Sequence, residues 1–268
     1  MNKARNGFLS GAALKIIACV SMVIDHFAAI VLWNYLRQSA AAGNQNPWLE
    51  DIYHVGRAIG RIAFVLFAYL LAEGFLYTGS RKKFLLRLGV FALISEIPFD
   101  LAFSGTCFDW SSQNVFFTLF LGVLALCMWE WADGCAGAFI SAICRYGAVA
   151  LCGLAAYWIK SDYCYTGVFL IFIFYLMHDT GLVCKASAAS AVLLLGIWSA
   201  NCLRYGESFS LKYLFFFSLR EMYGLAAFVP IALYDGTRGR QLPKWFWYGF
   251  YPAHILLLYG LSGLIGAS

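Results

Sequence analysis

The sequence predicts an all-α fold, a polytopic bundle of about nine transmembrane helices that forms a single integral-membrane domain over residues 1–268. Hydrophobic residues make up 62% of the chain and charged residues only 12%, and the mean hydropathy is +0.72. A soluble domain usually carries about 25% charged residues. Apolar runs of about 20 residues, the length that crosses a bilayer as a helix, recur along the chain. We therefore expect a multi-pass protein surrounded by the lipid bilayer.

Short linkers that carry turn residues separate the apolar segments, as at Gly79-Ser80, Asp133-Gly134 and Asp235-Gly236. The chain leaves no room between them for a second, soluble domain. The segments predicted to span the membrane cover residues 14–36, 56–78, 84–104, 114–132, 137–159, 164–178, 181–203, 211–234 and 245–266.

Basic residues gather at the N-terminus, in the loop between the second and third segments, and in the loop before the last segment. With nine spans, all three clusters fall on one side of the membrane, which the positive-inside rule makes the cytoplasm. The N-terminus is then cytoplasmic and the C-terminus lies outside. We read the net charge of +5 as topology and expect no nucleic-acid partner. The clusters are Lys3 and Arg5, then Arg81, Lys82, Lys83 and Arg87, then Arg238, Arg240 and Lys244.

The nine cysteines show no spacing typical of a zinc site, and most of them lie within apolar runs. We interpret them as small core residues and expect no metal. Cys107 and Cys164 fall in or beside loops predicted on the outer side, where a disulfide between them stays open.

The first segment, residues 14–36, places Asp25 and His26 near its middle. A charge at the centre of a membrane helix costs about 2.5–3.5 kcal/mol, so such residues usually face a cavity or a partner. The two side chains point about 100° apart, so the group that orients the His26 imidazole should come from another helix. Lys15 lies eleven residues before His26, about 16 Å along the same face. It either meets a phosphorylated carrier at the cytoplasmic mouth or reaches the headgroups.

The second segment carries two arginines one turn apart, Arg57 and Arg61, each preceded by a glycine, Gly56 and Gly60. The guanidinium of Arg61 keeps its charge and needs a carboxylate in apolar surroundings, and Asp25 is a candidate. The glycines permit close approach of another helix. A purely structural ion pair is the alternative interpretation.

The third segment ends with two carboxylates, Glu96 and Asp100, on one helix face, with Pro98 between them. Because proline removes a backbone donor, we expect a kink there. The spacing does not decide between an acid/base site and counter-ions for Arg57 or Arg61.

Asn114 opens the fourth segment, where helix capping is the simpler reading. His254 lies three residues after Tyr251 in the last segment. A second intramembrane histidine suggests a role paired with His26, although an interfacial position would also account for it.

Four of these ionisable residues would cost about 10–14 kcal/mol together if they were unpaired in the membrane. The whole fold is stable by only about 5–15 kcal/mol. They should therefore meet in one polar cavity, which indicates a reactive or transporting site. The four are Asp25, Arg61, Glu96 and Asp100.

Six sequence blocks, spread from about Leu14 to Leu258, resemble the TraX family, whose members are associated with N-terminal acetylation of F-type conjugative pilin. The family is similar, more distantly, to membrane acyltransferases such as the lysosomal heparan-glucosaminide acetyltransferase. The resemblance implies a bacterial inner membrane location, acetyl-CoA as donor, and an acceptor peptide or sugar with an amine or hydroxyl near the outer face. The blocks are LKIIACVSMVIDH, GRIAFVLFAYLLAEGF, RKKFLLRLGVFALISEIPFDLAF, QNVFFTL, YDGTRGR and FYPAHILLLY.

The resulting hypothesis is an integral-membrane acetyltransferase in which His26 is a general base or is transiently acetylated. Glu96 or Asp100 would orient the imidazole. A proton-coupled transporter or flippase with an Asp/Glu/His relay is the alternative, and a scaffold whose polar core only fixes helix packing is a third reading. The assigned groups are catalytic (His26, Asp25, Arg61, Glu96, Asp100), acetyl-CoA-binding (Lys15, Arg81, Lys82, Lys83) and substrate-binding (Arg57, Asn114, Tyr251, His254).

Overall fold

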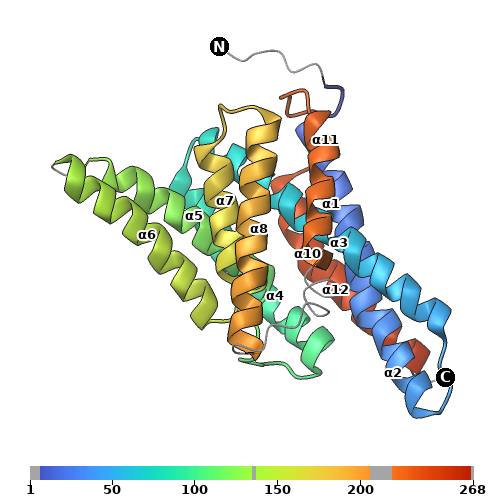
Figure 1. Cartoon of the computed structure of the whole chain (residues 1–268). Coiled ribbons are helices and arrows are strands. Elements are labelled where there is room, and N and C mark those ends of the chain that lie inside the picture. The colour runs from blue at the N-terminus through green and yellow to red at the C-terminus, as the bar shows by residue number, and fades with distance from the viewer. Residues whose placement is uncertain (1–6, 135–136, 206–218, 267–268) are drawn as a thin grey trace. The chain divides into compact units, whose positions relative to one another are not determined.

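The computed structural model describes residues 7–134, 137–205 and 219–266 (Figure 1). Its regular secondary structure is helical throughout these ranges, which confirms the all-α prediction. In chain order the elements are α1 (Gly11–His26), the π-helix η1 (Phe27–Leu32), α2 (Trp33–Ala41), α3 (Pro47–Leu76), α4 (Arg81–Ser104), α5 (Val115–Ala132), α6 (Ala138–Trp158), α7 (Cys164–Leu176), α8 (Leu182–Tyr205), α10 (Leu219–Met222), the 3-10 helix η3 (Tyr223–Ala227), α11 (Phe228–Ala232) and α12 (Lys244–Gly266).

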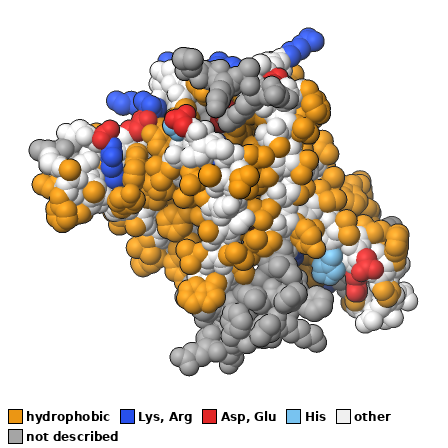
Figure 2. Space-filling view, turned by 45° about the horizontal axis from the view of Figure 1, so that its top comes forward, with side chains coloured by type: hydrophobic (Ala, Val, Ile, Leu, Met, Phe, Trp, Pro, Cys, Tyr) orange, Lys and Arg blue, Asp and Glu red, His pale blue; other side chains and the backbone are white. Residues whose placement is uncertain are grey.

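Within the described residues, six helical segments are long and apolar enough to cross a membrane. α7, with 13 residues, is shorter. α4 forms where the third span was predicted, but Arg87, Glu96 and Asp100 make it more polar than the six. Hydrophobic side chains are widespread over the described part of the face drawn in Figure 2, as expected for a surface in contact with lipid. The six are Gly11–Ala41, Pro47–Leu76, Val115–Ala132, Ala138–Trp158, Leu182–Ser199 and Lys244–Ile265. The count of nine spans and the orientation stay predictions.

The span predicted over residues 211–234 lies partly outside the described residues, and its described part is not one continuous α-helix. It consists of α10, η3 and α11 in succession. Gly224 lies in the 3-10 turn, where an added Cβ would come within 2.9 Å of Val65 Cγ2 and 3.2 Å of the Arg61 carbonyl oxygen. The backbone therefore passes close to α3 at this point, and this approach depends on glycine.

The chain divides into two compact units that interleave in the sequence. The first comprises Met1–Phe67, Ile97–Cys107 and Ser210–Ser268, and the second comprises Ala68–Glu96 and Phe108–Phe209. α3 and α4 each contribute residues to both units. The prediction of a single domain stays a prediction.

The first unit packs α12 along α1, η1 and α2 (Figure 1). Ser10 caps α1 by accepting a hydrogen bond at its side-chain hydroxyl from the Ala13 amide. The first two amides of α1 donate to the loop before α12. Gly11 N–H donates to the Thr237 carbonyl at 2.8 Å, and Ala12 N–H donates to the Arg238 carbonyl at 3.1 Å. The start of α1 and the last basic loop thus lie together, as the predicted cytoplasmic location of both requires.

In the second unit, α5, α6 and α7 all pack against one another, and α7 also packs against α8. An added Cβ on Gly122 of α5 would lie 2.5 Å from Ile171 Cδ1 of α7. Gly196 of α8 has the same relation to Thr166 of α7, with 2.3 Å to Oγ1. Small residues at such contacts allow helices to approach closely in a membrane, where apolar burial alone gives little drive to associate.

Candidate functional site

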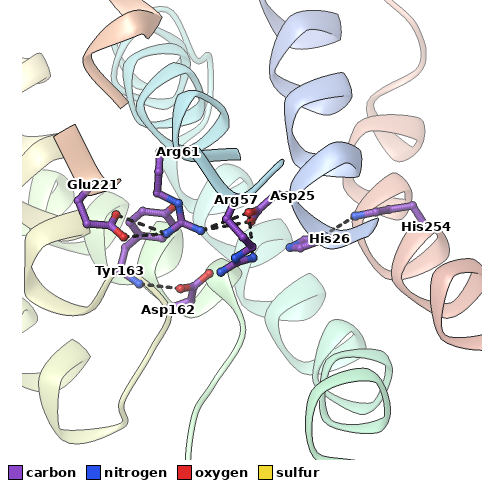
Figure 3. Close-up of polar contacts among 8 residues, drawn as sticks. All are labelled: Asp25, His26, Arg57, Arg61, Asp162, Tyr163, Glu221 and His254. Carbon is purple, nitrogen blue, oxygen red and sulfur yellow. Dashed lines mark hydrogen bonds and ion pairs between the residues drawn. The ribbon is translucent and has the colours of Figure 1, made fainter. Parts of the chain in front are cut away.

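Two arginines of α3 bind the carboxylate of Asp25 inside the first unit (Figure 3). Arg57 Nη1 lies 2.8 Å from Asp25 Oδ1, and Arg61 Nη2 lies 3.3 Å from Asp25 Oδ2. Arg61 Nη2 also donates to Asp25 Oδ1 at 3.5 Å. Because the arginines are one helical turn apart, both reach the same carboxylate. The predicted pairing of Asp25 with Arg61 is confirmed.

Glu221 of α10 completes this cluster, and sequence reasoning missed it. Arg61 Nη1 donates to Glu221 Oε1 at 3.1 Å and to Oε2 at 3.3 Å (Figure 3). Two carboxylates now face two guanidinium groups, so the formal charges balance. Glu221 could have been found by the rule that singled out Asp25, since it is an acidic residue within a predicted apolar span.

Gly60 and Gly56 allow α1 and α3 to approach closely at the Asp25 cluster. An added Cβ on Gly60 would lie 2.2 Å from both Cβ and Cγ of Asp25. On Gly56 it would lie 2.9 Å from Ala28 Cβ. The close approach predicted from the glycines is thus confirmed, and the Gly60 contact is what brings Asp25 within reach of both arginines.

We expect Gly60→Ala to lower the free energy of unfolding by about 1–3 kcal/mol, because the added methyl group forces apart two packed helices. The matched control is Gly249→Ala in α12, where an added Cβ meets nothing within 4 Å. This control should be neutral or stabilising by up to about 1 kcal/mol, as alanine favours a helix over glycine. Thermal unfolding in detergent measures both, and equal melting temperatures for the two variants would refute the close contact.

The imidazole of His26 is joined to that of His254 from α12 (Figure 3). His26 Nδ1 and His254 Nε2 are 2.6 Å apart, and both residues are buried. The ring planes differ by 13° with centroids 4.9 Å apart, as expected for two imidazoles joined through one proton. The partner of His26 Nδ1 is thus a residue of another helix, His254, at the position for which the sequence analysis named Glu96 or Asp100.

Aromatic edges hold the His26 ring from two other elements. Phe103 of α4 and Tyr251 of α12 approach it with centroid distances of 6.0 and 5.8 Å and near-perpendicular planes. Tyr251 makes the same kind of contact with His254, at 5.7 Å. Asp100 is 1% exposed, one turn before Phe103 on α4 and in the same unit. The ring contacts of Phe103 and Tyr251 fix the orientation of His26 within apolar surroundings.

A π-helix begins directly after His26, a feature that the sequence did not signal. The wide turns of η1 disturb the usual backbone hydrogen bonds, and Ser262 of α12 donates its hydroxyl to the Ile30 carbonyl at 3.2 Å. The same hydroxyl accepts a bond from Asn34 Nδ2 at 2.9 Å. Short π-helical turns within α-helices occur frequently at functional sites. The position of η1 therefore supports His26 as the centre of the candidate site.

Lys15 lies at the start of α1, beside the loop that closes this end of the unit. Its Nζ donates to Gln241 Oε1 at 2.9 Å and lies 5.4 Å from the centroid of the Trp247 ring. α1 is unbroken from Gly11 to His26, so the spacing of eleven residues places Lys15 and His26 near one face.

Glu96 and Asn114 form a separate polar contact in the second unit. Asn114 Nδ2 donates to Glu96 Oε2 and, at 2.8 Å, to the Ala92 carbonyl. Its Oδ1 accepts from the Phe116 amide at 2.9 Å, which confirms the capping interpretation. The convergence of Glu96 with Asp25, Arg61 and Asp100 in one cavity stays a prediction.

The basic cluster at the start of α4 also belongs to the second unit. Arg81 binds Glu130 of α5 through Nε and Nη2, both at 2.8 Å, and the Tyr175 hydroxyl donates to the same carboxylate at 3.2 Å. Lys82 and Lys83 are exposed. Arg81 therefore has a structural partner that the sequence analysis did not name.

Among the residues that the structure covers, no group of three or more His, Cys, Asp or Glu side chains could hold a metal ion. The expectation of no metal stays a prediction. Cys107 and Cys164 are both free thiols.

The fold and the buried ion cluster together define a helical integral-membrane protein with ionisable groups inside its apolar segments. Residues 10–262 match the TraX family, described as "TraX protein", and the chain belongs to this family. It is 32% identical over 130 residues to the "Probable fimbrial assembly protein FimC, serogroup H1" of Dichelobacter nodosus. That match covers 46% of this chain and 48% of the relative, so it spans about half of each. No solved structure gives a significant match.

Proposed function

We propose that the protein is an acetyltransferase of the bacterial inner membrane that moves an acetyl group from cytoplasmic acetyl-CoA to an acceptor at or beyond the membrane. The acceptor is an amine or hydroxyl, such as a pilin N-terminus or a glycan. TraX membership and the name of the fimbrial relative support the reaction and the acceptor class. The observation that carries the proposal is the buried pair of His26 and His254, joined at 2.6 Å within apolar helices.

His26 provides the reactive imidazole. Either it removes the proton of the acceptor while the acceptor attacks the thioester carbon, or it attacks that carbon and carries the acetyl group. In both routes the C–S bond of the thioester breaks and a C–N or C–O bond to the acceptor forms. Burial supports both routes, because a site that excludes water protects the thioester from hydrolysis.

Asp25, Arg57 and Arg61 act together in this proposal. The carboxylate of Asp25 binds both guanidinium groups, at 2.8 and 3.3 Å. Asp25 directly precedes His26 in the chain, so these charges are held close to the histidine. Fixed positive charge stabilises the oxyanion that develops when a thioester is attacked. Arg57 and Arg61 would contribute this charge without reorganising during the reaction.

The acetyl-CoA phosphates would be met at the end of the first unit that carries Lys15. Its ammonium group bonds to the neutral amide of Gln241, so this contact leaves its charge uncompensated. We expect Lys15→Gln to raise the KM for acetyl-CoA about 10-fold or more, because a hydrogen bond to a charged group contributes about 1.5–3 kcal/mol. Lys15→Arg, which keeps the charge, should stay near the wild-type KM. An unchanged KM for Lys15→Gln, from initial rates at varied acetyl-CoA, would remove Lys15 from the donor site.

Binding of acetyl-CoA separates this proposal from a proton-coupled transporter or flippase. A ligand that binds only the folded protein at about 100 times its Kd stabilises it by about 2.7 kcal/mol. The purified protein in detergent should therefore melt at a higher temperature with acetyl-CoA than with an equal concentration of AMP. A melting temperature that neither compound raises would count against the acetyltransferase and in favour of the transporter.

A further inference from the structure

The hydrogen bonds of His254 determine which of its nitrogens carries a proton. His254 Nδ1 lies 2.7 Å from the Phe250 carbonyl oxygen, one turn earlier on α12. Because a carbonyl oxygen can only accept, Nδ1 must be the donor. In a neutral imidazole the other nitrogen, Nε2, then carries a lone pair and no proton.

The same constraint passes to His26. Its Nδ1 is 2.6 Å from His254 Nε2, and this contact needs one donor. With a lone pair on His254 Nε2, the donor is His26 Nδ1–H. The proton of the neutral His26 ring is therefore on Nδ1, and the lone pair is on Nε2. A backbone carbonyl of α12 thus selects the basic nitrogen of a histidine on α1.

We infer that His254 is a positioning residue that holds His26 in the Nδ1–H form and shares that proton when His26 becomes an imidazolium. This inference rests on the proposed acetyl transfer, in its general-base form. His26 Nε2 takes the proton of the acceptor, the acceptor atom bonds to the acetyl carbon, and the C–S bond breaks. Nε2 then gives the proton to the CoA thiolate, so the histidine pair ends as it began. His254 has the part that an aspartate plays in a Ser–His–Asp triad.

The surroundings explain why a histidine, and not a carboxylate, suits this position. An additional carboxylate would place another anion in an apolar segment, which is costly. The nearest acidic residue along α1, Asp25, is already bound by Arg57 and Arg61. The Phe250 ring lies nearly parallel to the His254 ring, 16° apart with centroids at 5.1 Å, and limits its rotation.

Two substitutions separate positioning from bulk packing. His254→Leu removes the acceptor for Nδ1–H, and we expect kcat to fall by about 10²–10⁴-fold, the usual contribution of general acid–base catalysis. The KM for acetyl-CoA should stay near that of the wild type. His254→Gln keeps an amide oxygen that can accept the proton, so it should recover at least about 10-fold of the lost kcat. His54→Leu, at an exposed position on α3, is the matched control and should leave kcat unchanged. A wild-type kcat in His254→Leu, or equal losses in the leucine and glutamine variants, would overturn the inference.

A spectroscopic measurement tests the tautomer without any acetyl transfer. The chain has four histidines, so ¹⁵N-histidine NMR in micelles, assigned with His26→Ala, resolves the protonated nitrogen of His26. We expect Nδ1–H in the wild type and a shift toward Nε2–H in His254→Leu. An Nε2–H or doubly protonated His26 in a wild type that transfers acetyl groups would overturn this inference alone. The expected tautomer in a protein that transfers none would overturn the proposed function and this role with it.

Discussion

Replacing His26 by alanine is expected to lower kcat for acetyl transfer by about 10²–10⁴-fold, the usual contribution of general acid–base catalysis. The variant loses the only ring nitrogen that the histidine pair leaves basic, together with the means of forming an acetylated intermediate. Lys15, which would meet the acetyl-CoA phosphates, is unchanged in this variant, so donor binding should persist. Transfer of labelled acetyl groups by the purified protein in liposomes measures the loss.

The stability of the variant is the necessary control, because His26 is also a packed side chain. His26→Ala should keep the melting shift caused by acetyl-CoA, which shows that the donor site is intact. His54→Ala, a substitution of the same kind at an exposed position on α3, should transfer acetyl groups at the wild-type rate. Wild-type transfer by His26→Ala would exclude both proposed roles of this residue.

Replacing Arg61 by methionine is expected to destabilise the protein by about 3–5 kcal/mol, the cost of breaking a buried ion pair from one side. Arg61 is only 9% exposed and bonds to both Asp25 and Glu221. Its removal leaves the Glu221 carboxylate without this cation and Asp25 with Arg57. The free energy of unfolding in a detergent–denaturant titration measures the effect.

A double substitution and a control in the second unit make this result specific. Adding Glu221→Gln to Arg61→Met should recover part of the loss, because the unbalanced carboxylate is then gone. Arg81→Met removes a cation that is 46% exposed, from a pair with Glu130, and should cost less than about 1 kcal/mol. A similar small cost for Arg61→Met, or no recovery in the double variant, would show that the cluster does not support the fold.

The sequence was informative wherever a physical rule acts along one helix. Hydropathy located α5, α6, α7, α8 and α12 to within a few residues, because membrane helices need long apolar runs. The high cost of burying an unpaired charge led to the prediction that Asp25 pairs with Arg61, which the structure confirms. The glycines before Arg57 and Arg61 correctly indicated close helix approach, since only glycine leaves room for Asp25 there.

The features that escaped prediction depend on packing between distant segments. His26 and His254 are 228 residues apart, so the sequence could suggest a pair but not which nitrogens meet. Glu96 and Asp100 seemed equal candidates to orient His26 because spacing along α4 does not reveal what each carboxylate faces. The π-helix after His26 arises in an ordinary apolar run, FAAIVL, and packs against the distant α12.

The most direct test of the central claim is transfer of labelled acetyl groups from acetyl-CoA to protein and glycan in membranes that contain either the wild type or His26→Ala at equal abundance. The account predicts label that appears only with the wild type and depends on acetyl-CoA. Label at the same rate with both proteins, or with neither above membranes that lack the protein, would contradict it.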